Sequence, residues 1–135
     1  MLPCAGVIIF NKKLDTILVK THENRYSFPK GKREKKESQL DNALREMSEE
    51  TGIMPSGINI IPNKNFVELS EKGNPCVLYY IAFLKSENKI DFKFDPEELA
   101  NVSFYSVDEA LKLDGFKDSR KKILQEAYEF IKSKL

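Results

Sequence analysis

Apolar and polar residues alternate in blocks along the chain, and the blocks have the length and composition of β-strands. Leu2–Phe10 and Thr16–Thr21 are predicted as two strands joined by the polar turn Asn11–Asp15. Later runs rich in β-branched and aromatic residues predict further strands at Ile58–Ile61, Asn65–Leu69, Val77–Leu84 and Val102–Tyr105.

A helical spacing of apolar residues replaces this pattern in three places. Ser38–Glu50 is predicted as a helix, with Ser38 as its N-cap, Asp41 in the first turn and Gly52 ending it. Ser106 and Glu109 form a capping-box sequence that opens a short helix ending near Gly115. From about residue 118 a last helix places apolar residues on one stripe, namely Ile123, Leu124, Ala127, Tyr128 and Ile131.

Strands on either side of one early helix, followed by a closing helix, favour a mixed β-sheet covered on both faces. The fold class predicted is therefore α/β. With 135 residues, no internal repeat and no linker, the chain is expected to form one domain over residues 1–135.

Charge and cysteine content narrow the class of protein. Lys plus Arg number 22 and Asp plus Glu 21, so a strongly basic DNA-binding protein is disfavoured. Cys4 and Cys76 lie in apolar runs and are expected to be buried free thiols. No apolar run approaches the roughly 18 residues that span a bilayer. We therefore expect a cytoplasmic protein without a membrane partner, either a monomer or a homodimer.

Three carboxylates share one side of the first predicted helix. At about 100° per residue, Glu46, Glu49 and Glu50 lie at relative angles of about 0°, −60° and +40°. Like charges at this spacing repel one another, and a hard divalent cation such as Mg²⁺ or Mn²⁺ would relieve the repulsion. Taken alone, a glutamate-rich helix face is more often simply solvated.

A basic loop precedes this helix and changes the interpretation. Lys30, Lys32 and Arg33 flank Gly31, whose backbone allows close approach and offers a carbonyl ligand. Basic side chains beside clustered carboxylates make a site that can hold a metal ion and a polyanion together. Lys35 and Lys36 continue the basic run and are expected to be solvated.

The segment GKREKKESQLDNALREMSEETGI, residues 31–53, resembles the Nudix box, G-x5-E-x7-R-E-U-x-E-E-x-G-U with U an apolar residue. Every defined position agrees, and the chain around the box is similar to a minimal Nudix domain. The resemblance implies an α/β/α sandwich that hydrolyses a nucleoside diphosphate linked to another group, with Mg²⁺ or Mn²⁺ as cofactor.

Carried over by position, the resemblance also implies roles for single residues. Glu46, Glu49 and Glu50 would bind the metal, with the Gly31 carbonyl as a further ligand. Glu37 and Arg45 would form a structural ion pair, and Gly52 would be structural as well. The general base stays open among Glu46, Glu50 and a downstream glutamate. Glu98 is favoured there as a catalytic or metal-binding residue, with Glu97 as its competitor.

The box does not select a substrate, but the residues before it narrow the choice. Tyr26–Gly31 is similar to the lead-in of asymmetrical diadenosine tetraphosphate hydrolases and of messenger-RNA decapping enzymes. The first group is favoured because the chain is compact and because Val77–Tyr80 resembles a strand that carries an adenine-stacking tyrosine.

In this interpretation Tyr79 stacks a base, unless it is the member of the Tyr79–Tyr80 pair that belongs to the core. Lys30, Lys32, Arg33 and His22 would contact the substrate. Decapping, with RNA as partner, is the alternative, followed by hydrolysis of diphosphoinositol polyphosphates. A non-catalytic nucleotide- or RNA-binding module of the same fold is the alternative from another class.

Overall fold

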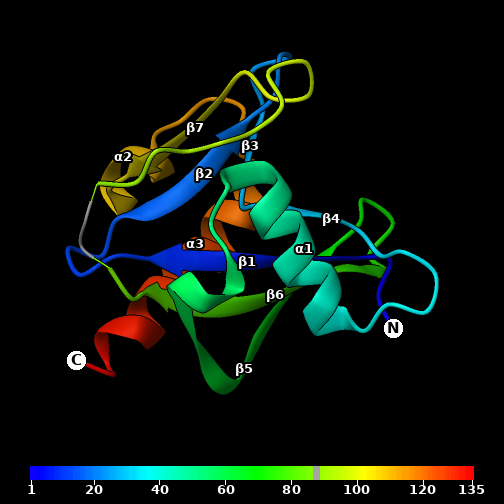
Figure 1. Cartoon of the computed structure of the whole chain (residues 1–135), viewed down its shortest axis with the longest axis horizontal. Coiled ribbons are helices and arrows are strands. Elements are labelled where there is room, and N and C mark those ends of the chain that lie inside the picture. The colour runs from blue at the N-terminus through cyan, green and yellow to red at the C-terminus, as the bar shows by residue number, and fades with distance from the viewer. Residues whose placement is uncertain (87–88) are drawn as a thin grey trace.

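Strand β1 (Cys4–Phe10) lies at the centre of one mixed sheet in the computed structural model, which describes residues 1–86 and 89–135 (Figure 1). It runs parallel to β6 (Pro75–Leu84) and antiparallel to β2 (Thr16–Lys20) and β4 (Lys30–Lys32). Residues 5–10 are buried, as expected of a strand covered on both faces.

The remaining strands extend the sheet to its two sides. β5 (Ile58–Leu69) pairs with β6 and forms one edge. On the other side, β3 (Tyr26–Ser27) and β7 (Asn101–Tyr105) both pair with β2.

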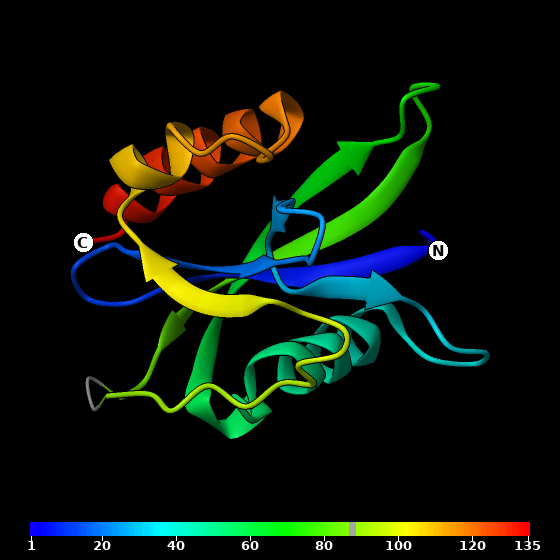
Figure 2. The same cartoon turned by 90° about the horizontal axis from the view of Figure 1, so that it is seen from above.

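Helices cover both faces of this sheet, so the α/β/α prediction is confirmed. Helix α1 (Gln39–Thr51) lies on one face, and α2 (Val107–Leu111) and α3 (Asp118–Lys132) lie on the other (Figure 2). A 3-10 turn, η1 (Pro55–Gly57), connects α1 to β5. In the described part of the chain no helix is long and apolar enough to cross a membrane.

The predicted caps of α1 and the predicted start of α2 are confirmed, but α2 ends at Leu111 rather than near Gly115. The Ser38 hydroxyl accepts from the N–H of Asp41, and Gly52 ends α1 in the left-handed conformation at φ 80°. Ser106 and Glu109 form the complete capping box of α2. These caps depend on neighbours within the same turn, which explains why the sequence predicts them well.

The observed strands differ from the predicted ones where pairing with a neighbouring strand determines their bounds. The two strands expected between residues 58 and 69 are one strand, β5, with a register shift between Ile60 and Asn65. Asn63 takes a positive φ of 62° within this irregularity, a conformation that asparagine tolerates. β3 and β4 were not predicted, because such short strands are defined by their partners rather than by a pattern of their own.

Each face of the sheet carries its own apolar cluster. The α1 side buries Ala5, Val7 and Met47, and the α3 side buries Ile8, Tyr79 and Leu124. Cys4 and Cys76 are free thiols as expected, but both are half-exposed rather than buried. They lie at the end of the sheet where the apolar cluster on the α3 side opens to solvent.

Candidate active site

Helix α1 presents its carboxylates to the short strand β4. Glu49 is exposed, whereas Glu46 and Glu50 are half-buried. Gly31 lies directly against Glu46, and a Cβ at this position would overlap the Glu46 carboxylate. Glycine at this position therefore leaves room for the present conformation of the Glu46 carboxylate, which would have to move if a Cβ were added.

Arg45 ties the preceding loop to the helix. Its Nε donates to Oε2 of Glu37 at 2.7 Å, and its Nη2 donates to the Lys32 carbonyl at 2.8 Å. The ion pair expected between Glu37 and Arg45 is present. Hydrogen bonds from Arg45, and then from the backbone N–H of Glu34, lower the pKa of Glu37 to about 2. Nη1 of Arg45 also approaches carboxylate oxygens of Glu46 and Glu49 at 3.3 Å.

The half-buried carboxylates are held in an environment that disfavours their charge. Burial, followed by the charge of Glu49, raises the pKa of Glu46. Burial raises the pKa of Glu50 to about 7, although the backbone N–H of Lys30 donates to its Oε1 at 2.9 Å and opposes the shift. The charges of Glu46 and Glu98 add to the rise. Burial is thus the main reason why both carboxyl groups hold their protons more tightly than usual.

This donor set fits a hard divalent cation by its chemistry. Three carboxylates and the Gly31 carbonyl are oxygen ligands of the kind that Mg²⁺ and Mn²⁺ prefer. Over residues 1–86 and 89–135, no group of three His, Cys, Asp or Glu side chains is gathered closely enough to hold a metal ion. Arg45 and Asn42, which donates to the Gly31 carbonyl at 3.1 Å, hold part of the donor set. Metal binding would therefore require these side chains to change rotamer.

The two downstream glutamates lie in the turn before β7, and both are exposed. The charge of Glu98 acts on Glu50, and the backbone N–H of Glu97 is bound to Asp95 Oδ1 at 2.9 Å. His22 is exposed, and its Nε2 lies 2.7 Å from the Pro96 carbonyl. His22 thus anchors the turn that carries both glutamates.

The basic side chains around Gly31 do not form one cluster facing the carboxylates of α1. Gly31 pairs with Ala5 and faces α1, so the side chains of Lys30 and Lys32 point to the α3 face of the sheet. Lys30 is half-buried and Lys32 exposed. Nη1 of Arg33 donates to the carbonyls of Glu34 and Glu37, so this residue helps to hold the loop. A contact between Arg33 and the substrate stays a prediction.

The expectation that Tyr79 stacks a base is wrong for this structure. Its side chain is fully buried, its ring meets Phe28 edge-on at 5.1 Å, and its hydroxyl donates to Oε1 of Glu68 at 2.7 Å. Tyr79 is the core member of the Tyr79–Tyr80 pair. Tyr80 is half-buried on the opposite face. The sequence could not decide between them, because it does not say which face of β6 meets which helix.

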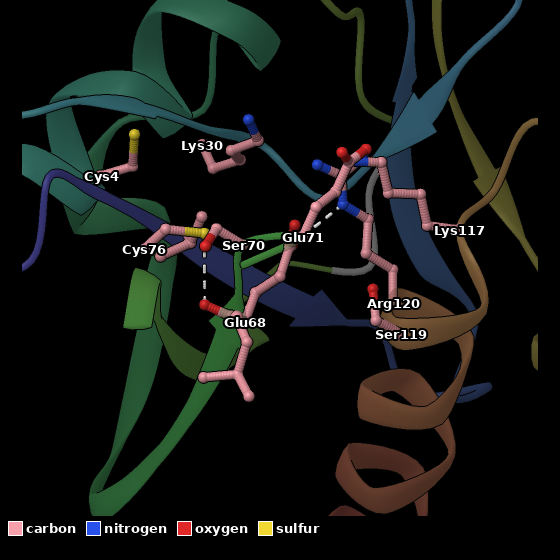
Figure 3. Close-up of a pocket in the computed structure, with 11 residues that line it drawn as sticks. Cys4, Lys30, Glu68, Ser70, Glu71, Cys76, Lys117, Ser119 and Arg120 are labelled. Atoms are coloured by element: carbon pink, nitrogen blue, oxygen red, sulfur yellow. Dashed lines mark hydrogen bonds and ion pairs between the residues drawn. The ribbon is translucent and has the colours of Figure 1, made fainter. Parts of the chain in front are cut away.

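A cavity of about 730 Å³ opens on the α3 side of β4 (Figure 3). Strands β1, β4, β5 and β6 and the beginning of α3 supply its lining, which is Cys4, Lys30, Glu68, Leu69, Ser70, Glu71, Cys76, Val77, Lys117, Ser119 and Arg120. Lys30 connects this cavity to the carboxylates, since its side chain lines the cavity while its backbone N–H binds Glu50.

A buried ion pair in this cavity was missed by sequence reasoning. Arg120 Nε donates to Oε1 of Glu68 at 2.9 Å, and Arg120 Nη1 donates to the Tyr26 carbonyl at 3.1 Å. The side chains of Arg120 and Glu68 are 9% and 4% exposed. One signal was available, because Arg120 lies three residues before Ile123 and so on the apolar stripe of α3.

Comparisons with known proteins agree with one another on the family. The family model described as "NUDIX domain" matches residues 2–127. Pig bis(5'-nucleosyl)-tetraphosphatase [asymmetrical] (Sus scrofa) is 30% identical over 143 aligned positions, which cover 96% of this chain and 95% of the relative. The m7GpppN-mRNA hydrolase of Saccharomyces cerevisiae is 34% identical over 98 positions, covering 71% of this chain and 10% of that protein. A solved structure of a C. elegans Ap4A hydrolase in a binary complex superposes with a TM-score of 0.83 at 20% identity, covering 96% of this chain and 98% of that one.

Proposed function

The chain belongs to the NUDIX domain family and is a Nudix hydrolase, and on this premise we propose that it cleaves a phosphoanhydride bond of a dinucleoside polyphosphate. We propose Mg²⁺ or Mn²⁺ as the cofactor, held by Glu46, Glu49, Glu50 and the Gly31 carbonyl, with Glu98 as a further ligand or catalytic group. Diadenosine tetraphosphate is the preferred substrate, and the cytoplasm is the expected place of action.

The observation that carries this proposal is the environment of Glu50. Its carboxylate is half-buried, is bound by the Lys30 N–H and lies near the charges of Glu46 and Glu98. These charges crowd at β4, whose opposite face lines the cavity. Lys30 belongs to both places, since its backbone N–H binds Glu50 while its side chain lines the cavity.

Each part of the site has a role in this reaction. A bound divalent cation would neutralise phosphate oxygens and acidify a bound water. Glu50, half-buried beside the Lys30 N–H, is a candidate to accept a proton from an attacking water, and Glu46 and Glu98 remain the other candidate bases. Lys30 offers an ammonium group to phosphate oxygens at the entrance of the cavity. Arg45 keeps the loop and helix in place for all of them.

The choice of substrate rests on how much of each relative's length this chain matches. The tetraphosphatase relative matches along nearly its whole length, whereas the messenger-RNA hydrolase matches over one tenth of its own. Decapping is the second candidate, because the local identity to that hydrolase is 34% and the FPKGK lead-in is shared with its subfamily. Lys30 and Lys32 point to the same face and would there contact the RNA backbone.

A substrate panel tests the proposal. We expect diadenosine tetraphosphate to be hydrolysed faster than capped RNA, diphosphoinositol polyphosphate, ADP-ribose or nucleoside triphosphates, with Mg²⁺ and with Mn²⁺. Glu50→Gln and Glu49→Gln should each lower kcat by at least about a hundredfold with the fold retained. Glu126→Gln, an exposed carboxylate on α3, is the matched control and should leave kcat unchanged.

Two results would contradict the proposal. If Glu50→Gln is as active as the parent, Glu50 is not part of the metal site. If the parent hydrolyses no member of the panel yet binds nucleotides, and Glu50→Gln binds them equally well, the chain is a binding module rather than an enzyme.

A further inference from the structure

Cys4 and Cys76 lie on neighbouring strands at one end of the sheet. Cys4 begins β1, which runs parallel to β6, and its Cα partner on β6 is Val77, the residue after Cys76. Adjacent strands are about 4.8 Å apart and each residue advances a strand by about 3.3 Å, so we expect the two cysteine Cα atoms about 6 Å apart. Disulfides join Cα atoms that are about 4.4–6.8 Å apart, so the backbone spacing permits a bond.

A β-bulge at Cys76 brings both cysteine side chains to the same face of the sheet. Glu68 of β5 pairs with Val77, and the next residue of β5 pairs with Pro75. The register therefore passes over Cys76. In a regular strand the Cys76 side chain would lie on the face opposite to that of Val77, but the extra residue of a bulge re-aims its side chain. Cys76 accordingly packs, as Cys4 does, against the apolar cluster on the α3 side.

Both thiols are free and can be reached by a small molecule. Each cysteine is half-exposed, and both line the cavity of about 730 Å³. Cys76 Sγ donates to the backbone carbonyl of Glu68 at 3.3 Å. Figure 3 shows the two thiols pointing in different directions, so the side chains have to change rotamer before the sulfur atoms can meet. The hydrogen bond lost in this change is weak, because a thiol is a poor donor.

We propose that Cys4 and Cys76 form a reversible disulfide between β1 and β6 when hydrogen peroxide enters the cavity. The Cys4 thiolate attacks one peroxide oxygen, the O–O bond breaks, hydroxide leaves, and Cys4 becomes a sulfenic acid. The Cys76 sulfur then attacks the Cys4 sulfur, and the sulfenic oxygen leaves as water together with the Cys76 proton. Two thiols and one peroxide thus give one disulfide and two water molecules, with two electrons passing to the peroxide.

The order of these two steps follows from the surroundings of Cys76. Burial, and then the charge of Glu68, raises the pKa of the Cys76 thiol. Only a thiolate attacks a peroxide efficiently, so Cys76 is a poor first nucleophile at neutral pH. Cys4 is therefore assigned the first step, and Cys76 attacks a neighbour that is already oxidised.

Peptide mapping of the unaltered chain tests the bond. After treatment with hydrogen peroxide and digestion with trypsin without reductant, we expect residues 1–12 and 73–85, which contain the two cysteines, as one linked pair of peptides. The intact chain should become lighter by two hydrogen atoms, and dithiothreitol should restore its mass by thiol–disulfide exchange. Oxidation that gives only sulfenic or sulfinic acids, or only a bond between two chains, would overturn the proposal.

The bond should depend on the fold. Dimedone traps a sulfenic acid and so competes with Cys76 for oxidised Cys4. In the folded protein we expect mostly the disulfide, because the sheet holds Cys76 beside Cys4. In urea the unfolded chain seldom brings the two residues together, so mostly the dimedone adduct of Cys4 should form. Mostly adduct in the folded protein as well would contradict the proposed proximity.

The two serine variants test the order of attack. Cys76→Ser removes the second sulfur and should leave Cys4 as a sulfenic acid that dimedone labels. Cys4→Ser removes the first nucleophile, and Cys76 should then be oxidised severalfold more slowly than Cys4 is in Cys76→Ser. Equal rates of labelling in the two variants would overturn the assignment of Cys4 to the first step.

The bond would alter a wall that the cavity shares with the candidate active site. Lys30, whose side chain lines the cavity, pairs with Gly6 of β1, two residues beyond Cys4. A disulfide ties β1 to β6 at this wall and removes the Cys76 sulfur from the Glu68 carbonyl. This consequence rests on the proposed function: we expect oxidation to raise KM for diadenosine tetraphosphate severalfold with little change in kcat, and dithiothreitol to reverse the effect.

Cys4→Ser is the matched control for the kinetic effect, and its KM should not respond to peroxide. A rise in KM that also occurs in Cys4→Ser comes from oxidation elsewhere and would overturn the regulatory role. An unchanged KM in the fully disulfide-bonded parent would overturn it as well.

The disulfide and the proposed function fail separately. Linked peptides in a protein that hydrolyses no dinucleoside polyphosphate would support the disulfide and overturn the substrate assignment. Hydrolysis of diadenosine tetraphosphate by a protein that forms no linked peptides would overturn the disulfide and leave the activity standing.

Discussion

The backbone N–H of Lys30 donates to Oε1 of Glu50 at 2.9 Å, which joins β4 to the carboxylate face of α1. This bond offsets part of the cost of burying Glu50 but not all of it, since the pKa of Glu50 still rises to about 7. A carboxylate kept at such a cost in stability is typical of a functional site.

Glu50→Gln should stabilise the metal-free protein at alkaline pH. Because the folded-state pKa of about 7 exceeds the usual 4.5, the native state binds more protons between these values and its free energy of unfolding falls as pH rises. At pH 8 the variant should gain up to about 3 kcal/mol in urea unfolding with chelator present. At pH 4 the two proteins should be equally stable. A variant less stable than the parent at pH 8 would contradict the assigned environment.

Glu37→Gln should alter the acid side of the stability profile in the opposite sense. The pKa of Glu37 is lowered from 4.5 to about 2, so its ion pair with Arg45 stabilises the fold fully above pH 4.5. That contribution disappears as pH falls from 4.5 to about 2. The variant should therefore be less stable than the parent at pH 6, and the difference should vanish near pH 2. Thermal melts at both pH values measure it, and a difference that persists at pH 2 would argue against the ion pair as its source.

Gly31→Ala should damage the site through a steric clash. The new methyl group would overlap the Glu46 carboxylate, the flexible end of that side chain, and displace it from its present position beside β4. We expect kcat to fall at least about tenfold with little loss of stability, because a change of the Glu46 side-chain conformation relieves the clash. Gly57→Ala is the control, because a Cβ there meets Ile53 Cγ2 at an ordinary 3.4 Å. Unchanged kcat in Gly31→Ala would show that Glu46 can move away without consequence.

Replacing Tyr79 separates a core role from a stacking role. Tyr79→Phe removes the hydroxyl that donates to Glu68 and should cost about 1–3 kcal/mol in unfolding experiments. Tyr79→Ala removes a buried ring as well and should cost about 3–5 kcal/mol. Neither pattern is expected of a residue that only stacks a base, which would raise KM while leaving stability near that of the parent.

What the sequence predicts well is local in the chain. The caps of α1 and α2, the shared side of Glu46, Glu49 and Glu50, and the Glu37–Arg45 pair all lie within about two helical turns or a single loop. Chain periodicity and short-range chemistry predict the caps and the shared side of the three glutamates, whereas the Glu37–Arg45 pair is predicted by the resemblance to the Nudix box. The resemblance to the Nudix box adds the family, which the comparisons confirm.

The features that the sequence predicts poorly depend on the order and register of the strands in the sheet. The buried side of Tyr79 follows from the register of β6 on β1, and the half-exposed cysteines follow from where that pairing meets solvent. The pairing of Glu68 with Arg120 joins β5 to α3 across 52 residues. No local pattern encodes such a contact, because the two residues become neighbours through the sheet topology.

The three residues of β4 lie between the carboxylates of α1 and the cavity on the α3 side of the sheet. Gly31 lies against the Glu46 carboxylate on the α1 side, and the side chain of Lys30 lines the cavity on the α3 side. Because these neighbouring residues belong to one short strand paired with β1, a substitution at either position is expected to affect both the carboxylates of α1 and the wall of the cavity.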